Sequence, residues 1–223
     1  KIKLTSWSDV KKLKWPSIVF VGILGFWTIQ SMRRVGDWAN PIKLMEHDEP
    51  VCQSSAHANS LLATSYIKAA TEDLSLTEDQ KQERISQAIV QMKKAIAIFP
   101  YLFNYHFDLG RFYVLKGDYF SAFEAFKDAH LLVPKNPLAL DELVKCSFDL
   151  NRTDETLLFG ERLLKAVGPQ EKTIELMAFQ ALRNQQFQHA EKWAVFGRKN
   201  FPNNLNFPRL IADSEAKKVI PKN

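Results

Sequence analysis

Small and turn-forming residues recur about every 34 residues through most of this chain. Prolines fall at intervals of 34, 35 and 33 residues, at Pro100, Pro134, Pro169 and Pro202. Two further columns keep a 34-residue step, with Ala88, Ala122, Thr156 and Ala190 in one and Ala95, Ala129, Leu163 and Gly197 in the other. A fixed period of this length is typical of solenoids, in which each repeat packs only against its neighbours. The period therefore predicts a stack of similar helical units.

The clearest unit reads "NYHFDLGRFYVLKGDYFSAFEAFKDAHLLVP", from Asn104 to Pro134. It resembles the tetratricopeptide repeat (TPR), a helical hairpin of 34 residues, at nine positions: Leu109, Gly110, Tyr113, Gly117, Tyr119, Ala122, Phe126, Ala129 and Pro134. In such a hairpin we expect Gly110 and Ala122 to face each other where the two helices cross most closely. Gly117 and Asp118 are expected to form the turn, and Pro134 to end the second helix.

The repeats divide the chain into an array over residues 54–204. Its predicted units are 54–102, 103–136, 137–170 and 171–204. In the first unit the linker "TEDLSLTEDQKQ" is about 13 residues too long for the repeat, so either the helices are longer or an acidic loop extends from one edge. Residues 205–223 are predicted to form a capping helix and tail, because the end of a solenoid needs a polar outer face.

An apolar segment precedes the array. From Trp15 to Met32 there are 18 residues without a charge, and a helix of this length spans roughly 27 Å, close to the hydrocarbon thickness of a bilayer. A buried core helix usually carries a polar stripe, which is missing here. A cleaved signal peptide usually has a shorter apolar part and a small-residue cleavage site. The predicted fold is therefore all-α, with a single transmembrane helix at 16–32 followed by a TPR-type α-solenoid of about four helix pairs plus a capping helix.

The charges beside this segment predict its orientation. Residues 1–15 contain five lysines and one aspartate, and so hold +4 of the net charge of +5. Arg33, Arg34 and the more distant Lys43 follow the span. Because the larger basic excess usually marks the cytoplasmic side, residues 1–15 are predicted to be cytoplasmic. The array, joined through a juxtamembrane connector at 33–53, is predicted to be periplasmic, luminal or extracellular. Only +1 remains beyond residue 15, which argues against a nucleic-acid partner.

Solenoids of this kind curve, and the first helix of each repeat lines a concave surface that usually holds peptides or partner subunits. The candidate partner-binding residues on this surface are Asn104, Tyr105, Asp108, Arg111, Phe112, Asp141, Glu142 and Lys145. Arg111 and Lys145 are suited to hold an acidic group of a peptide. The alternative is ordinary solvated helix surface. The sequence thus predicts a membrane-anchored protein–protein interaction scaffold, with residues 16–32 in contact with the lipid bilayer.

The sequence contains no recognisable catalytic or cofactor-binding pattern. Its five histidines lack metal-ligand spacing, and there is no glycine-rich phosphate loop or nucleophile elbow. Cys52 and Cys146 are 94 residues apart and match no metal or redox spacing, so both are interpreted as small hydrophobic residues. No catalytic, metal-binding or cofactor-binding residue is predicted, and this chain is not expected to be an enzyme.

The junction after the apolar segment resembles the C-terminal part of polytopic glycosyltransferases of the TMTC-like and GT-C type, which carry TPR tails. The matching positions are Arg33 or Arg34, Trp38, Leu44 and the expected helix at 54–66. This resemblance implies repeats on the non-cytoplasmic side that present acceptor protein to an active site in other segments. The absence of an initiator Met at Lys1 agrees with a segment of a longer chain. A third alternative is a single-span subunit of a larger membrane complex.

Overall fold

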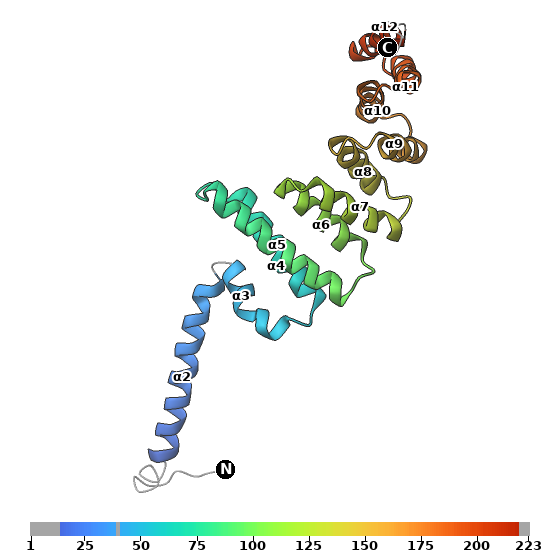
Figure 1. Ribbon diagram of the computed structural model, residues 1–223. Helices are drawn as coiled ribbons and strands as arrows, with labels where there is room; N and C mark the ends of the chain where they lie inside the picture. Colours follow the sequence, from blue (N-terminus) through green and yellow to red (C-terminus); the bar gives the residue numbers. More distant parts are fainter. Residues whose placement is uncertain (1–13, 39–40, 219–223) are drawn as a thin grey trace. The chain divides into compact units, whose positions relative to one another are not determined.

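The computed structural model describes residues 14–38 and 41–218, and all regular structure in these ranges is helical (Figure 1). The chain divides into two compact units, Lys1–Cys52 and Gln53–Asn223. Most of the predicted cytoplasmic segment and the last five residues of the predicted tail lie outside the described residues.

The first unit contains helix α2, Lys14–Trp38, and helix α3, Pro41–Cys52. In α2 the window Ser17–Val35 is long and apolar enough to cross a membrane, and none of it is buried; a signal sequence has the same properties. The hydroxyl of Thr28 donates to the carbonyl of Leu24 at 2.7 Å, so its polar group is satisfied within the helix. The helix extends beyond the predicted span because arginine is a good helix former. The predicted connector at 33–53 is therefore largely helical.

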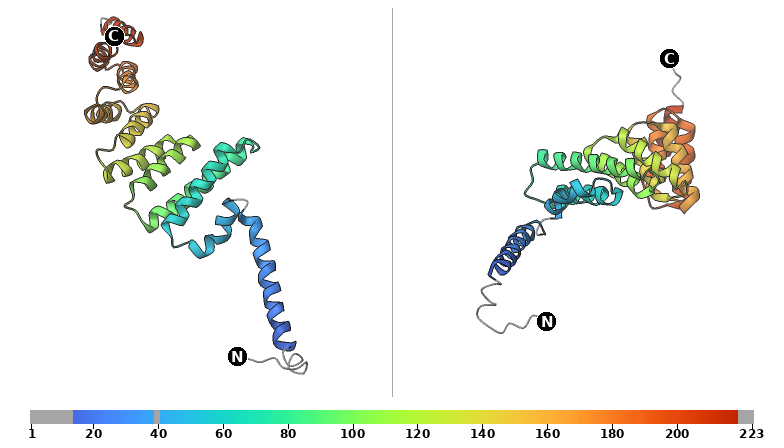
Figure 2. Two further views of the ribbon diagram at one scale, coloured as in Figure 1. Left: turned by 180° about the vertical axis from the view of Figure 1, so that it is seen from behind. Right: turned by 90° about the horizontal axis from the view of Figure 1, so that it is seen from below.

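The second unit consists of four antiparallel helix pairs and one further helix, which confirms the predicted α-solenoid (Figures 1 and 2). The pairs are α4 (Ala56–Glu72) with α5 (Glu78–Ile98), α6 (Phe103–Lys116) with α7 (Tyr119–Leu132), α8 (Pro137–Asp149) with α9 (Thr153–Val167), and α10 (Glu171–Arg183) with α11 (Phe187–Asn200). The last helix is α12, Asn206–Lys218. Most contacts join helices that are adjacent or next but one in the sequence.

The extra residues of the first repeat lengthen its helices. Helices α4 and α5 contain 17 and 21 residues, whereas α6 and α7 contain 14 each. Ser55 caps α4 by accepting from the backbone N–H of Ala58. At the start of α5, Thr77 and Gln80 form a capping box in which each side chain accepts from the other's backbone N–H. Two strong start signals and few helix-breaking residues thus convert the insertion into a longer hairpin.

Three of the four turns between paired helices use a left-handed residue, at a 34-residue interval. Gly117 has φ +80° after α6, and Asn151 and Gln185 occupy the equivalent positions with φ +57° and +61°. Glycine and asparagine adopt this conformation readily, whereas glutamine does so with strain. Asp118 then caps α7 by accepting from the backbone N–H of Ser121. The third turn is therefore the strained member of the series.

Helix crossings depend on glycines that face large side chains. A Cβ atom on Gly110 would meet the ring of Phe126, which is fully buried. The ring of Phe126 is thus the nearest neighbour beside Gly110, while the expectation that Gly110 faces Ala122, which is fully buried in the same hairpin, stays a prediction. Gly160 and Gly197 are used in the same way: their nearest side chains are Met177 on α10 and Phe207 on α12. These glycines let α9 and α11 approach the next helix.

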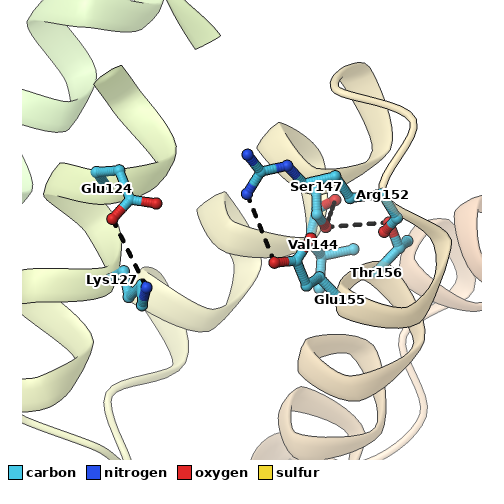
Figure 3. A network of polar contacts seen from close by, with 7 residues as sticks. All are labelled: Glu124, Lys127, Val144, Ser147, Arg152, Glu155 and Thr156. Carbon is cyan, nitrogen blue, oxygen red and sulfur yellow. Dashed lines mark hydrogen bonds and ion pairs between the residues drawn. The ribbon is translucent and has the colours of Figure 1, made fainter. Parts of the chain in front are cut away.

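The third repeat, formed by α8 and α9, places a polar pair in the core. Thr156 stands in the column that holds alanine in the other repeats, and it is fully buried together with Ser147. The two hydroxyl oxygens lie 3.0 Å apart, and that of Ser147 also reaches the carbonyl of Val144 at 3.0 Å (Figure 3). Arg152 pairs with Glu155 at 3.5 Å nearby. The hydroxyl of Thr156 also lies 2.9 Å from the carbonyl of Arg152, so each of the two buried hydroxyls has a backbone acceptor besides the other hydroxyl.

Helix α12 closes the array. Phe207, Leu210 and Ile211 are buried in one core cluster with residues of α10 and α11, while Arg209, Glu215 and Lys217 are exposed. The helix therefore has one apolar face and one polar face, as expected of the terminal element of a solenoid.

Candidate functional site

An open groove runs over the first helices of the first three repeats. We call it the inner-helix groove; its cavity volume is about 510 Å³. It is lined by Thr64, Ile67, Lys68 and Glu72 of α4, by Asp108, Arg111, Phe112, Val114 and Leu115 of α6, and by Glu142 of α8. Its lining is therefore mixed, with charged groups of both signs beside aliphatic and aromatic surface.

Four of the eight predicted binding residues line this groove: Asp108, Arg111, Phe112 and Glu142. The other four do not. Tyr105 is a core residue, and most of Phe112 is buried as well, because both project from the packed side of α6. Asn104 is exposed at the start of α6. Asp141 and Lys145 lie beside the groove and are connected to it through Glu142.

Acidic and basic residues repeat in register along this face. On α6, Arg111 lies 3.8 Å from Asp108; 34 residues later on α8, Lys145 lies 2.8 Å from Glu142 and 2.7 Å from Asp141. Burial raises the pKa of Asp108, an effect that the charge of Arg111 partly opposes. Burial lowers the pKa of Lys145, but its hydrogen bonds and charge interactions with the two carboxylates outweigh this and raise the pKa overall. Lys145 is therefore a firmly held cation.

A second groove continues the first helices toward the C-terminus. We call it the aromatic groove; its volume is about 400 Å³. It is lined by Phe148 of α8, by Lys172, Glu175, Leu176, Phe179 and Leu182 of α10, and by Asn206, Arg209, Leu210 and Asp213 of α12. The rings of Phe148 and Phe179 are tilted, with centroids 6.0 Å apart. Leu176 and Phe179 occupy the register positions of Glu142 and Lys145, so the same face changes from charged to apolar between repeats.

The α4 residues of the inner-helix groove were missed from the sequence, although a signal for them exists. Leu62, Ala63 and Tyr66 are spaced like Leu109, Gly110 and Tyr113, at an offset of 47 residues, which is the 34-residue period plus the 13-residue insertion. Subtracting this offset from the α6 lining residues gives the α4 positions. Thr64, Ile67 and Lys68 follow in this way.

His106 and Cys146 in the array make contacts that belong to the packing of the helices. His106 contacts the carbonyl of Pro100 through Nε2 at 2.8 Å. Cys146 is buried, which raises its thiol pKa to about 12; the side chain of Cys52 lies outside those described. In the described part of the chain, no group of three His, Cys, Asp or Glu side chains is placed to hold a metal ion.

The antiparallel pairs, their 34-residue offset and the groove along their first helices define a TPR-type solenoid. Among solved structures, a crystal structure of MamA matches with 14% identity and a TM-score of 0.57, over 85% of this chain and 96% of that chain. The crystal structure of YrrB, described as a TPR protein with an unusual peptide-binding site, matches with 13% identity and a TM-score of 0.59, over 78% and 83%. MamA from Desulfovibrio magneticus RS-1 matches with 13% identity and a TM-score of 0.54, over 70% and 85%.

Identities this low show that the fold is shared. No family model and no curated protein matches the sequence. The resemblance of the junction to polytopic glycosyltransferases stays a prediction.

Proposed function

We propose that this chain is a membrane-anchored scaffold that holds a peptide segment of a partner protein in the inner-helix groove, on the non-cytoplasmic side. The observation that carries the proposal is the groove itself, where Asp108, Arg111 and Glu142 surround apolar surface from Phe112 and Leu115. Such a lining suits an extended peptide, because charged groups orient the backbone and acidic side chains while the apolar surface takes a hydrophobic side chain.

The charges favour a peptide that contains an acidic residue. Lys145 is neutralised by Asp141 and Glu142, whereas Arg111 lies 3.8 Å from a single carboxylate whose pKa is raised. The guanidinium of Arg111 is therefore the cation best placed to form a bidentate pair with an incoming carboxylate. The aromatic groove extends the same face and offers Phe179 to a following apolar side chain. The peptide-binding site named for YrrB supports the same use of a TPR array.

Membrane anchoring is supported by α2. Its window Ser17–Val35 is apolar and wholly unburied, and an apolar surface of this size needs lipid or other transmembrane helices around it. The same observation suits a single-span subunit whose helix packs against other spans. The basic excess of residues 1–15 supports a cytoplasmic N-terminal side in either case.

The groove is tested by affinity capture with tagged full-length protein in detergent. We expect Arg111→Glu to reduce the captured amount of at least one specific partner about tenfold or more, since the substitution places a repelling charge in the groove. Lys145→Glu should weaken the binding of the same partner, because it leaves Glu142 without its cation. The matched control is Arg198→Glu, at an exposed position on the second helix α11. Identical partner lists for all four proteins would contradict the groove assignment.

The topology is tested separately with a cysteine at Asn203, an exposed position between α11 and α12, in a Cys52→Ser background. A membrane-impermeant thiol reagent should label this cysteine on intact cells or sealed vesicles of the matching orientation. Labelling on sealed vesicles that expose only their cytoplasmic face would place the array in the cytoplasm and contradict the proposal. Extraction of the protein by carbonate would contradict the anchor itself.

A further inference from the structure

A cationic pocket lies away from both grooves, over the second helices of two repeats. Its volume is about 600 Å³, and it is lined by His130, Pro134, Lys135, Leu140, Arg162, Lys165 and Ala166. None of these lining residues is acidic. Among the described residues, neither Lys135 nor Lys165 has an ion-pair partner. Three side-chain cations thus share one hollow without a carboxylate, an arrangement that an anionic ligand would stabilise.

The position of Arg162 in this pocket is fixed by its neighbours. Its Nη1 donates to Nε2 of His130 at 3.3 Å, and its guanidinium lies 5.8 Å from the ring centroid of Phe159. His130 is buried and its Nδ1 has no hydrogen-bond partner. Because His130 accepts from Arg162, it is neutral and leaves the full charge of the guanidinium uncompensated. The pocket therefore presents a held cation beside two lysines.

An apolar pocket adjoins the cationic pocket and shares Lys165 with it. Its volume is about 600 Å³, and it is lined by Glu161, Leu164, Lys165, Lys192, Trp193, Val195, Phe196 and Lys199. Its single acidic residue, Glu161, is paired with Lys192 at 3.4 Å. The floor is made by aliphatic and aromatic groups of α9 and α11. The two pockets together suit a segment that carries carboxylates next to one exposed apolar side chain.

The long hairpin of the first repeat carries such a segment. Residues 72–79, "EDLSLTED", contain four carboxylates and no basic residue. Between them lies Leu74, whose surface is 92% exposed, the highest value among the exposed large hydrophobic residues. The turn projects farther than the turn between α6 and α7, because α4 and α5 are the longer pair (Figures 1 and 2). It is therefore free to reach a surface on another molecule.

We infer that the acidic turn 72–79 of one copy docks into the cationic and apolar pockets of a second copy. Leu74 enters the apolar pocket at Trp193 and Phe196, and the neighbouring carboxylates meet Lys135, Arg162 and Lys165. Because the two surfaces differ and lie on different repeats, the contact is head-to-tail and repeats from copy to copy, giving a ring or an open chain. This assembly engages the inner-helix groove only at its edge, through Glu72, leaves the rest of the groove open, and brings several copies of the groove together.

The test is disulfide trapping between two full-length proteins with different tags, both carrying Cys52→Ser and purified in detergent. One copy carries Leu74→Cys and the other Ala166→Cys, at the border of the two pockets. We expect a mixed disulfide that joins the two tags. Lys135→Glu with Lys165→Glu in the second copy should slow trapping about tenfold or more, because like charges then face each other. Adding Asp73→Lys with Glu78→Lys to the first copy should restore it.

The matched control is Lys116→Glu with Lys217→Glu in the second copy, which reverses two exposed charges outside both pockets and should leave trapping unchanged. Far-UV circular dichroism of each variant shows whether the array is still folded. The inference is overturned if the mixed disulfide does not form, if the control slows it equally, or if the reversed acidic turn fails to restore it. Loss of binding to vesicles of anionic lipid by the pocket variant, without any loss of trapping, would instead assign the pockets to a membrane surface.

Discussion

A Cβ atom on Gly110 would lie 2.6 Å from Cδ1 of Phe126, and the ring of Phe126 is fully buried. The ring cannot move outward without opening the crossing of α6 and α7. We therefore predict that Gly110→Ala lowers the free energy of unfolding by about 1–3 kcal/mol, through overpacking. Urea denaturation followed by circular dichroism measures this. The matched control is Gly25→Ala on α2, where a Cβ meets nothing within 4 Å; an equal loss there would refute the steric explanation.

The buried hydroxyl pair of the third repeat should behave as a coupled pair. Thr156→Val keeps the volume of the side chain but removes the hydroxyl that lies 3.0 Å from that of Ser147. We expect a loss of about 1 kcal/mol in the free energy of unfolding. In a double-mutant cycle with Ser147→Ala, the combined loss should be smaller than the sum of the single losses. Strictly additive losses would show that the two hydroxyls do not interact.

The turns at Asn151 and Gln185 should respond oppositely to glycine. Gln185→Gly relieves a left-handed residue and should raise the free energy of unfolding by up to about 1 kcal/mol. Asn151→Gly relieves little strain, because asparagine adopts this conformation readily, and it removes the oxygen that accepts from Nε2 of Gln180 at 3.0 Å and from Nδ2 of Asn184 at 2.8 Å. Because Gln180 is fully buried, we expect a net loss of about 1–3 kcal/mol. Thermal unfolding of the two variants checks the contrast, and a change of the same sign in both would contradict it.

His130 should make the array sensitive to acid. Burial, and next the charge of Arg162, lower its pKa below the ordinary value of 6.5. The unfolded chain therefore binds a proton at higher pH than the folded chain does. The free energy of unfolding should fall as the pH drops below 6.5 toward the lower folded pKa, and His130 should have no influence above that window. Urea unfolding measured from about pH 8 to about pH 5 should show that the free energy of unfolding depends less steeply on pH in His130→Gln than in the wild type. The control His189→Gln, at an exposed position, should keep the original slope.

The fold could be predicted because its main signal is a period. Any column of residues that recurs every 34 positions indicates stacked equivalent units, whatever the individual side chains are. The contact between Gly110 and the ring of Phe126 could not be predicted in this way, since a period gives register and does not show which large side chain fills the space at a helix crossing. For the first repeat the sequence allowed either longer helices or an acidic loop. The structure shows longer helices, α4 and α5, and the caps at Ser55 and Thr77 are consistent with them.

The candidate site was predictable only in part, for a reason that lies in helix geometry. The predicted binding residues come from one stretch of α6 and one of α8, and on α6 they include both the packed side and the open side of the helix. Tyr105 was therefore included, although it lies in the core. The contribution of α4 depended on the 47-residue offset, which becomes apparent once the insertion is assigned to one hairpin. The cationic pocket is formed by α7, the loop between α7 and α8, α8 and α9, and no single segment indicates it.

The contacts of the array have a mechanical consequence. Each helix packs mainly against helices that are adjacent or next but one in the sequence, from α4 to α12. A pulling force applied between the two ends of the described array therefore passes mainly through these interfaces in series. Such an array yields at its weakest interface and extends stepwise, one hairpin at a time, while the remaining hairpins stay folded. It can thus act as an extensible tether whose length reports the tension on it.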